Sequence, residues 1–200
     1  MPTDNRIARV RRVLDSRQPD LRVVLEGVAI AHNASAVMRT CDAAGILHLD
    51  LISPNPALVA FNEAISTRAD RWLEITTHAS TAACLSQLKK AGLGIVATRV
   101  SERARPYTEL DYTRPLALVF GSESLGISDE ALAFADEVIQ IPMVGMVRSL
   151  NLSVAVAIVL YEAFKQRSAK RFYQERRLPE AEFDRLFKKW LKQDEGPYGN

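Results

Sequence analysis

The stretch LALVFGSESLG, residues 116–126, decides how this chain folds. Five apolar residues run directly into a loop that contains glycine, which predicts a fully buried strand ending at a turn. Similar short runs rich in Val, Ile and Leu predict four more strands. These runs cover residues 22–25, 48–52, 94–98 and 138–141.

Segments with helical patterning alternate with these strands, at residues 34–44, 81–91, 129–135 and 149–163. Ser128 precedes the third segment as an expected N-cap, and two acids follow in its first turn. The alternation predicts an α/β fold with a mostly parallel sheet and helices on both faces. Because the last segment is apolar on nearly every side, we expect it to be buried in the core or in a subunit interface.

The two ends of the chain hold its surplus positive charge. Residues 1–22 contain six Arg against three Asp, and residues 165–192 contain ten Lys or Arg against four acids. Residues 23–164 are acidic, with 10 basic against 15 acidic side chains. The asymmetry indicates terminal arms that meet a polyanion, and solvated helix faces are the alternative explanation.

Both ends also show amphipathic helical patterning. Apolar residues recur at helical spacing among the arginines of residues 7–14, before Pro19, and again within residues 180–191. We expect these two helices to pair. The predicted organisation is an N-terminal basic helical arm (1–20), a central domain (21–165) and a C-terminal basic helical extension (166–200).

Metal, disulfide and membrane functions find no support in the sequence. Cys41 and Cys84 are isolated and read as small buried hydrophobes in a reducing compartment, and His32, His48 and His78 lack metal-ligand spacing. No secretory or transit signal is recognisable, and no apolar run reaches the roughly 20 residues of a membrane span. The expectation is a cytoplasmic protein without a metal.

Ligands of open α/β sheets bind beyond the carboxyl ends of the strands, so the loops there are the candidate site. The loop at 121–126 is neither a G-x-G-x-x-G fingerprint nor a P-loop, which disfavours NAD and nucleoside triphosphates. A second loop leads through Ser149 and Asn151 into the apolar helix, where either residue alternatively serves only as an N-cap. Arg39 lies in a short helix of small residues, with a salt bridge to Asp42 or a neighbour as the structural alternative.

Taken together, these segments resemble the three ordered motifs of the TrmH/SpoU branch of the SPOUT methyltransferases. The motifs are Asn33 with Arg39-Thr40, then residues 120–126, then residues 141–155. The order and spacing match, and the resemblance extends over about residues 6–173.

Two further stretches, at residues 17–21 and 109–115, resemble the tRNA-specific TrmH group more than the ribosomal-RNA enzymes. The resemblance implies S-adenosylmethionine-dependent 2′-O-methylation of a ribose in tRNA, at the D-loop guanosine that is the eighteenth nucleotide. Another RNA position, in ribosomal RNA or tRNA, and a non-catalytic RNA-binding protein of the same fold are the alternatives. The resemblance further implies a homodimer and a deep C-terminal trefoil knot, a feature that periodicity would not predict.

The resemblance also assigns residues. The cofactor is expected to border Thr98, Gly121, Ile141, Met146 and Leu150. Arg39 is expected to bind the phosphate beside the target and to stabilise the developing oxyanion, because an arginine is ordinarily fully protonated. Residues expected to position Arg39 and the ribose are Asn33, Glu123, Ser149 and Asn151.

RNA contacts are expected from the basic ends, through Arg6, Arg9, Arg11, Arg12, Lys165, Lys170 and Arg171. One departure from the family pattern lies at residues 66–72, where Arg68 and Arg71 occupy a stretch that is commonly rich in Gly and Ser. Two added positive charges there would change how RNA approaches the site.

Overall fold

The computed structural model describes the chain except for residues 1, 28–30, 54–68, 103, 123–124 and 194–200. Within the described residues it contains one sheet of seven strands in the order β3-β2-β1-β6-β4-β7-β5, and every pairing is parallel. The strands are β1 (Leu21–Glu26), β2 (His48–Ile52), β3 (Glu74–His78), β4 (Gly94–Thr98), β5 (Arg105–Pro106), β6 (Leu116–Phe120) and β7 (Glu137–Gln140). The predicted parallel sheet is confirmed.

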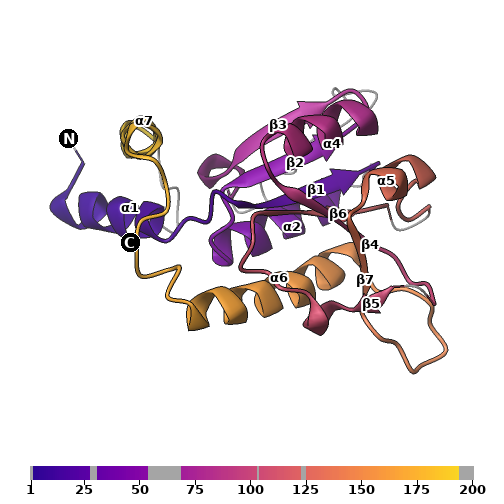
Figure 1. Cartoon of the computed structure of the whole chain (residues 1–200). Helices are drawn as coiled ribbons and strands as arrows, with labels where there is room; N and C mark the ends of the chain where they lie inside the picture. The colour runs from indigo at the N-terminus through magenta and orange to yellow at the C-terminus, as the bar shows by residue number, and fades with distance from the viewer. Residues whose placement is uncertain (1, 28–30, 54–68, 103, 123–124, 194–200) are drawn as a thin grey trace.

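Helices cover both faces of this sheet, as the sequence predicted (Figure 1). Helices α2 (Ala31–Ala43) and α6 (Leu152–Ala169) pack together on one face, and α4 (Thr81–Lys90) and α5 (Asp129–Phe134) pack together on the other. Two helices, α1 (Asp4–Asp15) and α7 (Glu180–Leu191), lie beyond the sheet. Short 3₁₀ helices occur at Ala69–Trp72 and Tyr107–Glu109.

Two apolar layers form because successive side chains of a strand point to opposite faces. In β1, Val23 and Leu25 join the layer under α2 and α6, whereas Val24 joins the layer under α4 and α5. All five residues of β6 are buried, and the strand order places β6 in the middle of the sheet. Burial on both faces explains why the strand reads as an unbroken apolar run.

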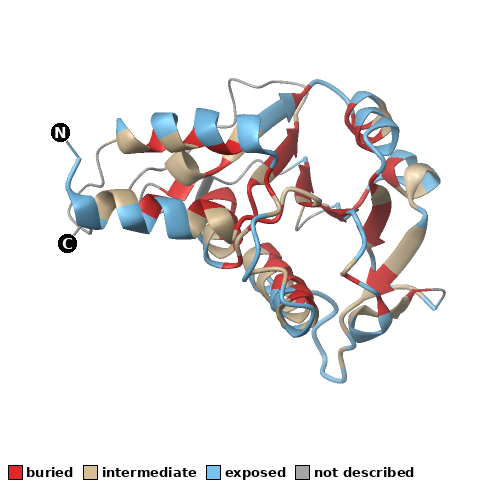
Figure 2. Ribbon diagram, turned by 60° about the vertical axis from the view of Figure 1, so that its left-hand side comes forward, coloured by how far each residue is buried: buried red, intermediate tan, exposed pale blue. Residues whose placement is uncertain are grey.

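A third apolar cluster joins the two terminal helices. Val10 and Leu14 of α1 pack with Phe183, Leu186 and Trp190 of α7. The predicted pairing of the two terminal helices is therefore confirmed, and Figures 1 and 2 show α1 and α7 together at one end of the molecule. In α1 the side chain of Thr3 caps the first turn.

Arg167 of α6 ties the arms to the body through a fully buried guanidinium group. It donates hydrogen bonds to the side chains of Gln18 (3.0 Å) and Asp20 (2.7 Å). It also donates to the carbonyls of Tyr112 (2.8 Å) and Arg114 (2.9 Å). Because a buried charge is tolerated only when it is paired and hydrogen-bonded, this network fixes the end of α6 to the segment after α1.

Arg17 makes a second buried connection. It pairs with the carboxylate of Asp42 and donates to the carbonyls of Asp42 and Ile46, while its guanidinium lies 5.1 Å from the ring centroid of Trp190. Asp42 therefore pairs with Arg17. This pair takes the place of the salt bridge between Arg39 and Asp42 that was the structural alternative for Arg39. Within the described part of the chain, no helix has the length and apolar character needed to span a membrane.

Candidate functional site

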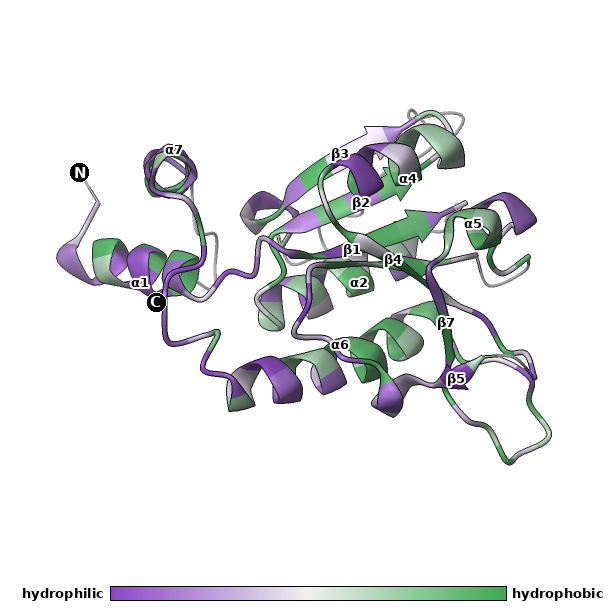
Figure 3. Cartoon of the chain, in the orientation of Figure 1, coloured by the Kyte–Doolittle hydropathy of each residue, from purple (hydrophilic) through white to green (hydrophobic). Residues whose placement is uncertain are grey.

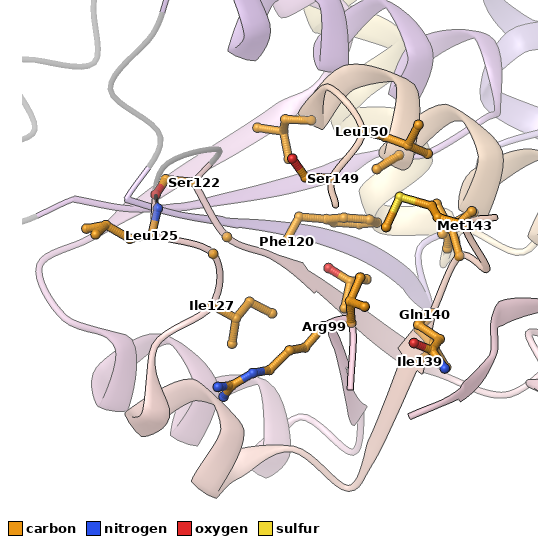
Figure 4. Close-up of a pocket in the computed structure, with 18 residues that line it drawn as sticks. Arg99, Phe120, Ser122, Leu125, Ile127, Ile139, Gln140, Met143, Ser149 and Leu150 are labelled. Atoms are coloured by element: carbon orange, nitrogen blue, oxygen red, sulfur yellow. Dashed lines mark hydrogen bonds between the residues drawn. The ribbon is translucent and has the colours of Figure 1, made fainter. Parts of the chain in front are cut away.

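A cavity of about 340 Å³ lies where the carboxyl ends of β4, β6 and β7 approach the start of α6 (Figure 4). Apolar side chains line much of it, among them Phe120, Ile139 and Leu152. Polar groups at its edge include Ser122 and Gln140. Its position beyond the carboxyl edge of a parallel sheet and its size are those of a small-molecule site.

The first wall is formed by the described residues of the loop between β6 and α5, 121–122 and 125–127, which we call the glycine loop. The amide of Gly126 donates to the carbonyl of Ser122 (2.8 Å), and the amide of Leu125 donates to the Ser122 hydroxyl (3.2 Å). A Cβ atom on Gly121 would lie 2.0 Å from the carbonyl carbon of Gly126, so any other residue would force the loop apart. Glycine lets the main chain itself approach a ligand here.

The second wall is the chain between β7 and α6, which contributes Ile141, Met143, Ser149 and Leu150. Helix α6 begins at Leu152, three residues later than the predicted start at 149, because Asn151 is its N-cap. The Asn151 Oδ1 atom accepts from the amide (2.9 Å) and the hydroxyl (2.6 Å) of Ser153. The N-cap role expected as an alternative for Asn151 is thus real.

Asn151 also reaches α2, because its Nδ2 donates a 3.3 Å hydrogen bond to Oδ1 of the buried Asn33. Asn33 and Asn151 are 118 residues apart in the sequence and belong to different motifs of the expected site. The structure brings them into contact. Ser149 lies two residues before the cap, on the cavity wall. Arg39 is exposed on α2 and is absent from the cavity lining, and Glu123 lies outside the described residues.

Of the residues expected to border a cofactor, Thr98, Gly121, Ile141 and Leu150 all line the cavity. The Thr98 hydroxyl donates to the carbonyl of Val119 (3.0 Å). Met146 is not among the lining residues and is 99% exposed.

Sequence reasoning missed several residues of the site. Phe120 and Val159 form part of the apolar wall, and Arg99 lies at its edge with an ion pair to Asp129 (3.3 Å). Arg99 follows directly after β4, so its place at a strand's carboxyl end was a usable signal. Val159 lies inside α6, and nothing in its local sequence distinguishes it from a core residue.

The basic residues expected to bind RNA divide into two groups. Arg6 donates to the carbonyls of Trp190 (3.2 Å) and Gln193, and the Arg11 guanidinium lies 5.1 Å from the ring centroid of Phe187, so both take part in the packing of α1 on α7. Arg11 is nevertheless exposed, as are the remaining residues of the set: Arg9, Arg12, Lys165, Lys170 and Arg171.

A further polar group lies apart from the cavity. Asp50, His78 and Cys84 place their potential ligand atoms within 4.8 Å of one another, an arrangement that sequence spacing did not indicate. His78 Nε2 lies 2.7 Å from Asp50, and Arg22 pairs with the same carboxylate at 3.5 Å. Burial, with the Asp50 charge nearby, raises the pKa of the Cys84 thiol to about 12, so the free thiol is protonated at neutral pH. The buried Asp50 carboxylate therefore has both Arg22 and His78 beside it.

Fold and cavity together define a parallel α/β protein whose small-molecule site is built from loops at the carboxyl edge of the sheet. The chain belongs to the SpoU rRNA Methylase family, whose model matches residues 20–161. It is 43% identical over 190 residues to the tRNA (guanosine(18)-2′-O)-methyltransferase of Thermus thermophilus, covering 95% of this chain and 97% of that protein.

Solved structures agree with this assignment. The Aquifex aeolicus TrmH/SpoU tRNA modifying enzyme superimposes with a TM-score of 0.89 at 41% identity, covering 94% of this chain and 95% of that one. An AdoMet-bound rRNA methyltransferase from Sinorhizobium meliloti matches with a TM-score of 0.62 at 27% identity, covering 78% of this chain and 59% of that one.

Proposed function

We propose that this chain is an S-adenosylmethionine-dependent methyltransferase that modifies the ribose 2′-hydroxyl of guanosine 18 in tRNA. The observation that carries the proposal is the match to the Thermus enzyme over 95% of the chain, which includes the sheet and most of both terminal arms. A match confined to the central domain would have supported the reaction type without the substrate.

The cofactor would occupy the cavity beyond β4, β6 and β7. The apolar wall suits an adenine ring, and the glycine loop leaves main-chain groups accessible because Gly121 has no side chain. Thr98, Ile141 and Leu150 would border the ligand. When bound, the cofactor supplies an electrophilic methyl group for transfer. The AdoMet-bound relative supports this choice of cofactor.

The chain's own residues would prepare the acceptor ribose. Arg39 would bind the phosphate next to the target and stabilise the negative charge that develops on the 2′-oxygen. Asn33 and Asn151, linked at 3.3 Å, would fix α2 relative to the start of α6, so that Arg39 and Ser149 face the same ribose. Glu123 is proposed to help position the ribose.

Helix α6 carries the proposal that the protein works as a homodimer. Apolar colouring covers the N-terminal half of α6 in Figure 3. Although one side of α6 is buried, Val154 (46%), Tyr161 (52%) and Phe164 (36%) remain exposed on it. A second copy of this chain would cover them, since a contiguous apolar surface usually marks an interface. Light scattering on the purified protein tests this directly.

Three finer features complete the proposal. The chain is divided into a central domain, 21–165, and two basic arms, 1–20 and 166–200. The central domain would carry out catalysis, and the two arms would bind tRNA. The trefoil knot is supported by the motif resemblance and by the insertion of β6 between β1 and β4. A tRNA substrate is consistent with a cytoplasmic location.

The proposal is tested by mapping 2′-O-methylated riboses in tRNA from cells with and without the gene. Loss of the methyl group at guanosine 18, and its return when the gene is restored, is the expected result. Unchanged methylation at that position, with loss elsewhere in the RNA pool, would contradict the proposed substrate.

A further inference from the structure

Glu26 is a buried carboxylate behind the cavity wall, with no role so far assigned. It is the last residue of β1 and is 8% exposed. The β1–β6 register pairs Leu25 with Phe120, so Glu26 lies level with Gly121, where the glycine loop begins. It is not among the residues that line the cavity.

The Glu26 carboxylate accepts hydrogen bonds from two other elements. Its Oε1 accepts from the hydroxyls of Thr81 (2.6 Å), the first residue of α4, and Ser128 (2.7 Å). Its Oε2 accepts from the amide of Ser128 (2.9 Å). A carboxylate is costly to bury, and these donors offset that cost because hydrogen bonds to a charged acceptor are strong.

Ser128 is the residue at which the glycine loop ends and α5 begins. Its hydroxyl caps α5 by accepting from the amide of Ala131 (3.0 Å) while it donates to Glu26. Just before it, Ile127 lines the cavity and is buried in the layer under α4 and α5. The loop is therefore held at its start by β6 and at its end by Glu26.

We propose that Glu26 is a positioning residue that holds the glycine loop in the conformation that accepts the cofactor. The inference rests on the proposed function, in which that cavity binds S-adenosylmethionine. Glu26 acts through Ser128 and touches neither the ligand nor the reacting atoms. Its removal should weaken cofactor binding while leaving the chemistry of a saturated enzyme intact.

The test substitutes Glu26→Met, which keeps the side-chain length and removes both acceptor oxygens. The affinity for S-adenosylmethionine, measured by calorimetry, is expected to fall about tenfold, the scale of one lost charge-assisted hydrogen bond. The KM for the cofactor should rise by a similar factor with kcat nearly unchanged. Amide exchange of residues 125–131, measured without cofactor, should become faster than in the wild-type protein.

Thr81→Val is the matched control, since it removes a hydrogen bond to the same carboxylate on the α4 side. It should leave both the cofactor affinity and the exchange of residues 125–131 unchanged. An equal effect in Thr81→Val and Glu26→Met would overturn the proposal, because the carboxylate would then act only on general packing. Wild-type affinity and exchange in Glu26→Met would overturn it as well.

If Glu26→Met does not fold, Ser128→Ala provides the second test, because it removes the hydroxyl hydrogen bond to Glu26 from the loop side, keeps the amide bond to Oε2 and leaves β1 intact. Unchanged exchange and affinity in that variant would contradict the proposal. Failure of the wild-type protein to bind S-adenosylmethionine would contradict the proposed function instead, and the exchange measurement would still show whether Glu26 anchors the loop.

Discussion

Asn151 donates a hydrogen bond of 3.3 Å to Asn33 and in the same position caps α6. One side chain thus serves two purposes through two different atoms. Its Oδ1 stabilises the helix, and its Nδ2 joins the third sequence motif to the first. The two purposes are separable, because an aspartate retains the acceptor and lacks the donor.

Asn151→Asp is expected to keep the thermal stability of the protein and to reduce methyl transfer at least tenfold. The carboxylate still caps α6, but it cannot donate to Asn33. Asn151→Ala should also lose the cap, at a cost of about 0.5–2 kcal/mol. Thermal melts and initial rates on both variants test this, and full activity in Asn151→Asp would show that the link to Asn33 is dispensable.

Gly121→Val should abolish detectable binding of S-adenosylmethionine at concentrations that saturate the wild-type protein. Its Cβ would overlap the carbonyl carbon of Gly126 at 2.0 Å, so the loop must open or shift. Gly145→Ala is the control, because a Cβ there meets nothing within 4 Å. Calorimetry should find normal affinity in the control. Normal affinity in Gly121→Val would mean that the ligand does not use this loop.

Arg39→Ala is expected to fold, to bind cofactor normally and to lose nearly all methyl transfer. Arg39 is exposed and does not line the cavity, so its proposed contacts form only when RNA is present. Arg39→Lys should recover only part of the rate, since an ammonium group cannot make the same bidentate contact with a phosphate. Wild-type turnover in Arg39→Ala would refute the role. A variant that fails to fold would indicate a structural one.

The exposed Lys and Arg side chains of the arms should strengthen tRNA binding and contribute little to the stability of the fold. Deleting the arms would confuse the two effects, because α1 and α7 share an apolar cluster and Arg167 binds Gln18. Arg12→Gln, Lys170→Gln and Arg171→Gln combined should instead weaken tRNA binding and flatten its salt dependence by about 0.7–0.9 in log–log slope per lost phosphate contact. Lys90→Gln, on the acidic body, is the control.

Melting temperature and binding would be measured on the same samples across a series of salt concentrations. A triple variant with unchanged affinity and slope would show that these three side chains do not meet RNA. A large loss of melting temperature would show that they stabilise the arms.

Four of the strands that the sequence predicted, β1, β2, β4 and β6, are mostly buried, and the fifth, β7, buries Ile139 and lies inside the sheet between β4 and β5. Both strands that it missed, β3 and β5, lie at the edges of the sheet. In β3, Thr76 and Thr77 are exposed, so no apolar run marks it, and β5 has only two residues, one of them Pro106. An edge strand has a neighbouring strand on one side only, so more of its residues are exposed to solvent. It therefore need not have the continuous apolar run that reveals a central strand.

Sequence likewise predicted the part of the site that follows directly after strands. Thr98, Gly121 and Ile141 each stand at or just after a strand's carboxyl end, where any parallel sheet places its ligands. Glu26 escaped notice because its partners are 55 and 102 residues away. Contacts over such separations depend on the packing of whole elements, which no local pattern encodes.

Methyl transfer to a defined ribose tests the proposed function most directly. The purified protein would be incubated with labelled S-adenosylmethionine and either an unmodified tRNA transcript or the same transcript carrying 2′-deoxyguanosine at position 18. The expected result is one methyl group per molecule on the first RNA, located at ribose 18, and none on the second, which lacks the acceptor hydroxyl. Equal labelling of both RNAs, or no labelling of either by protein that binds the cofactor, would contradict it.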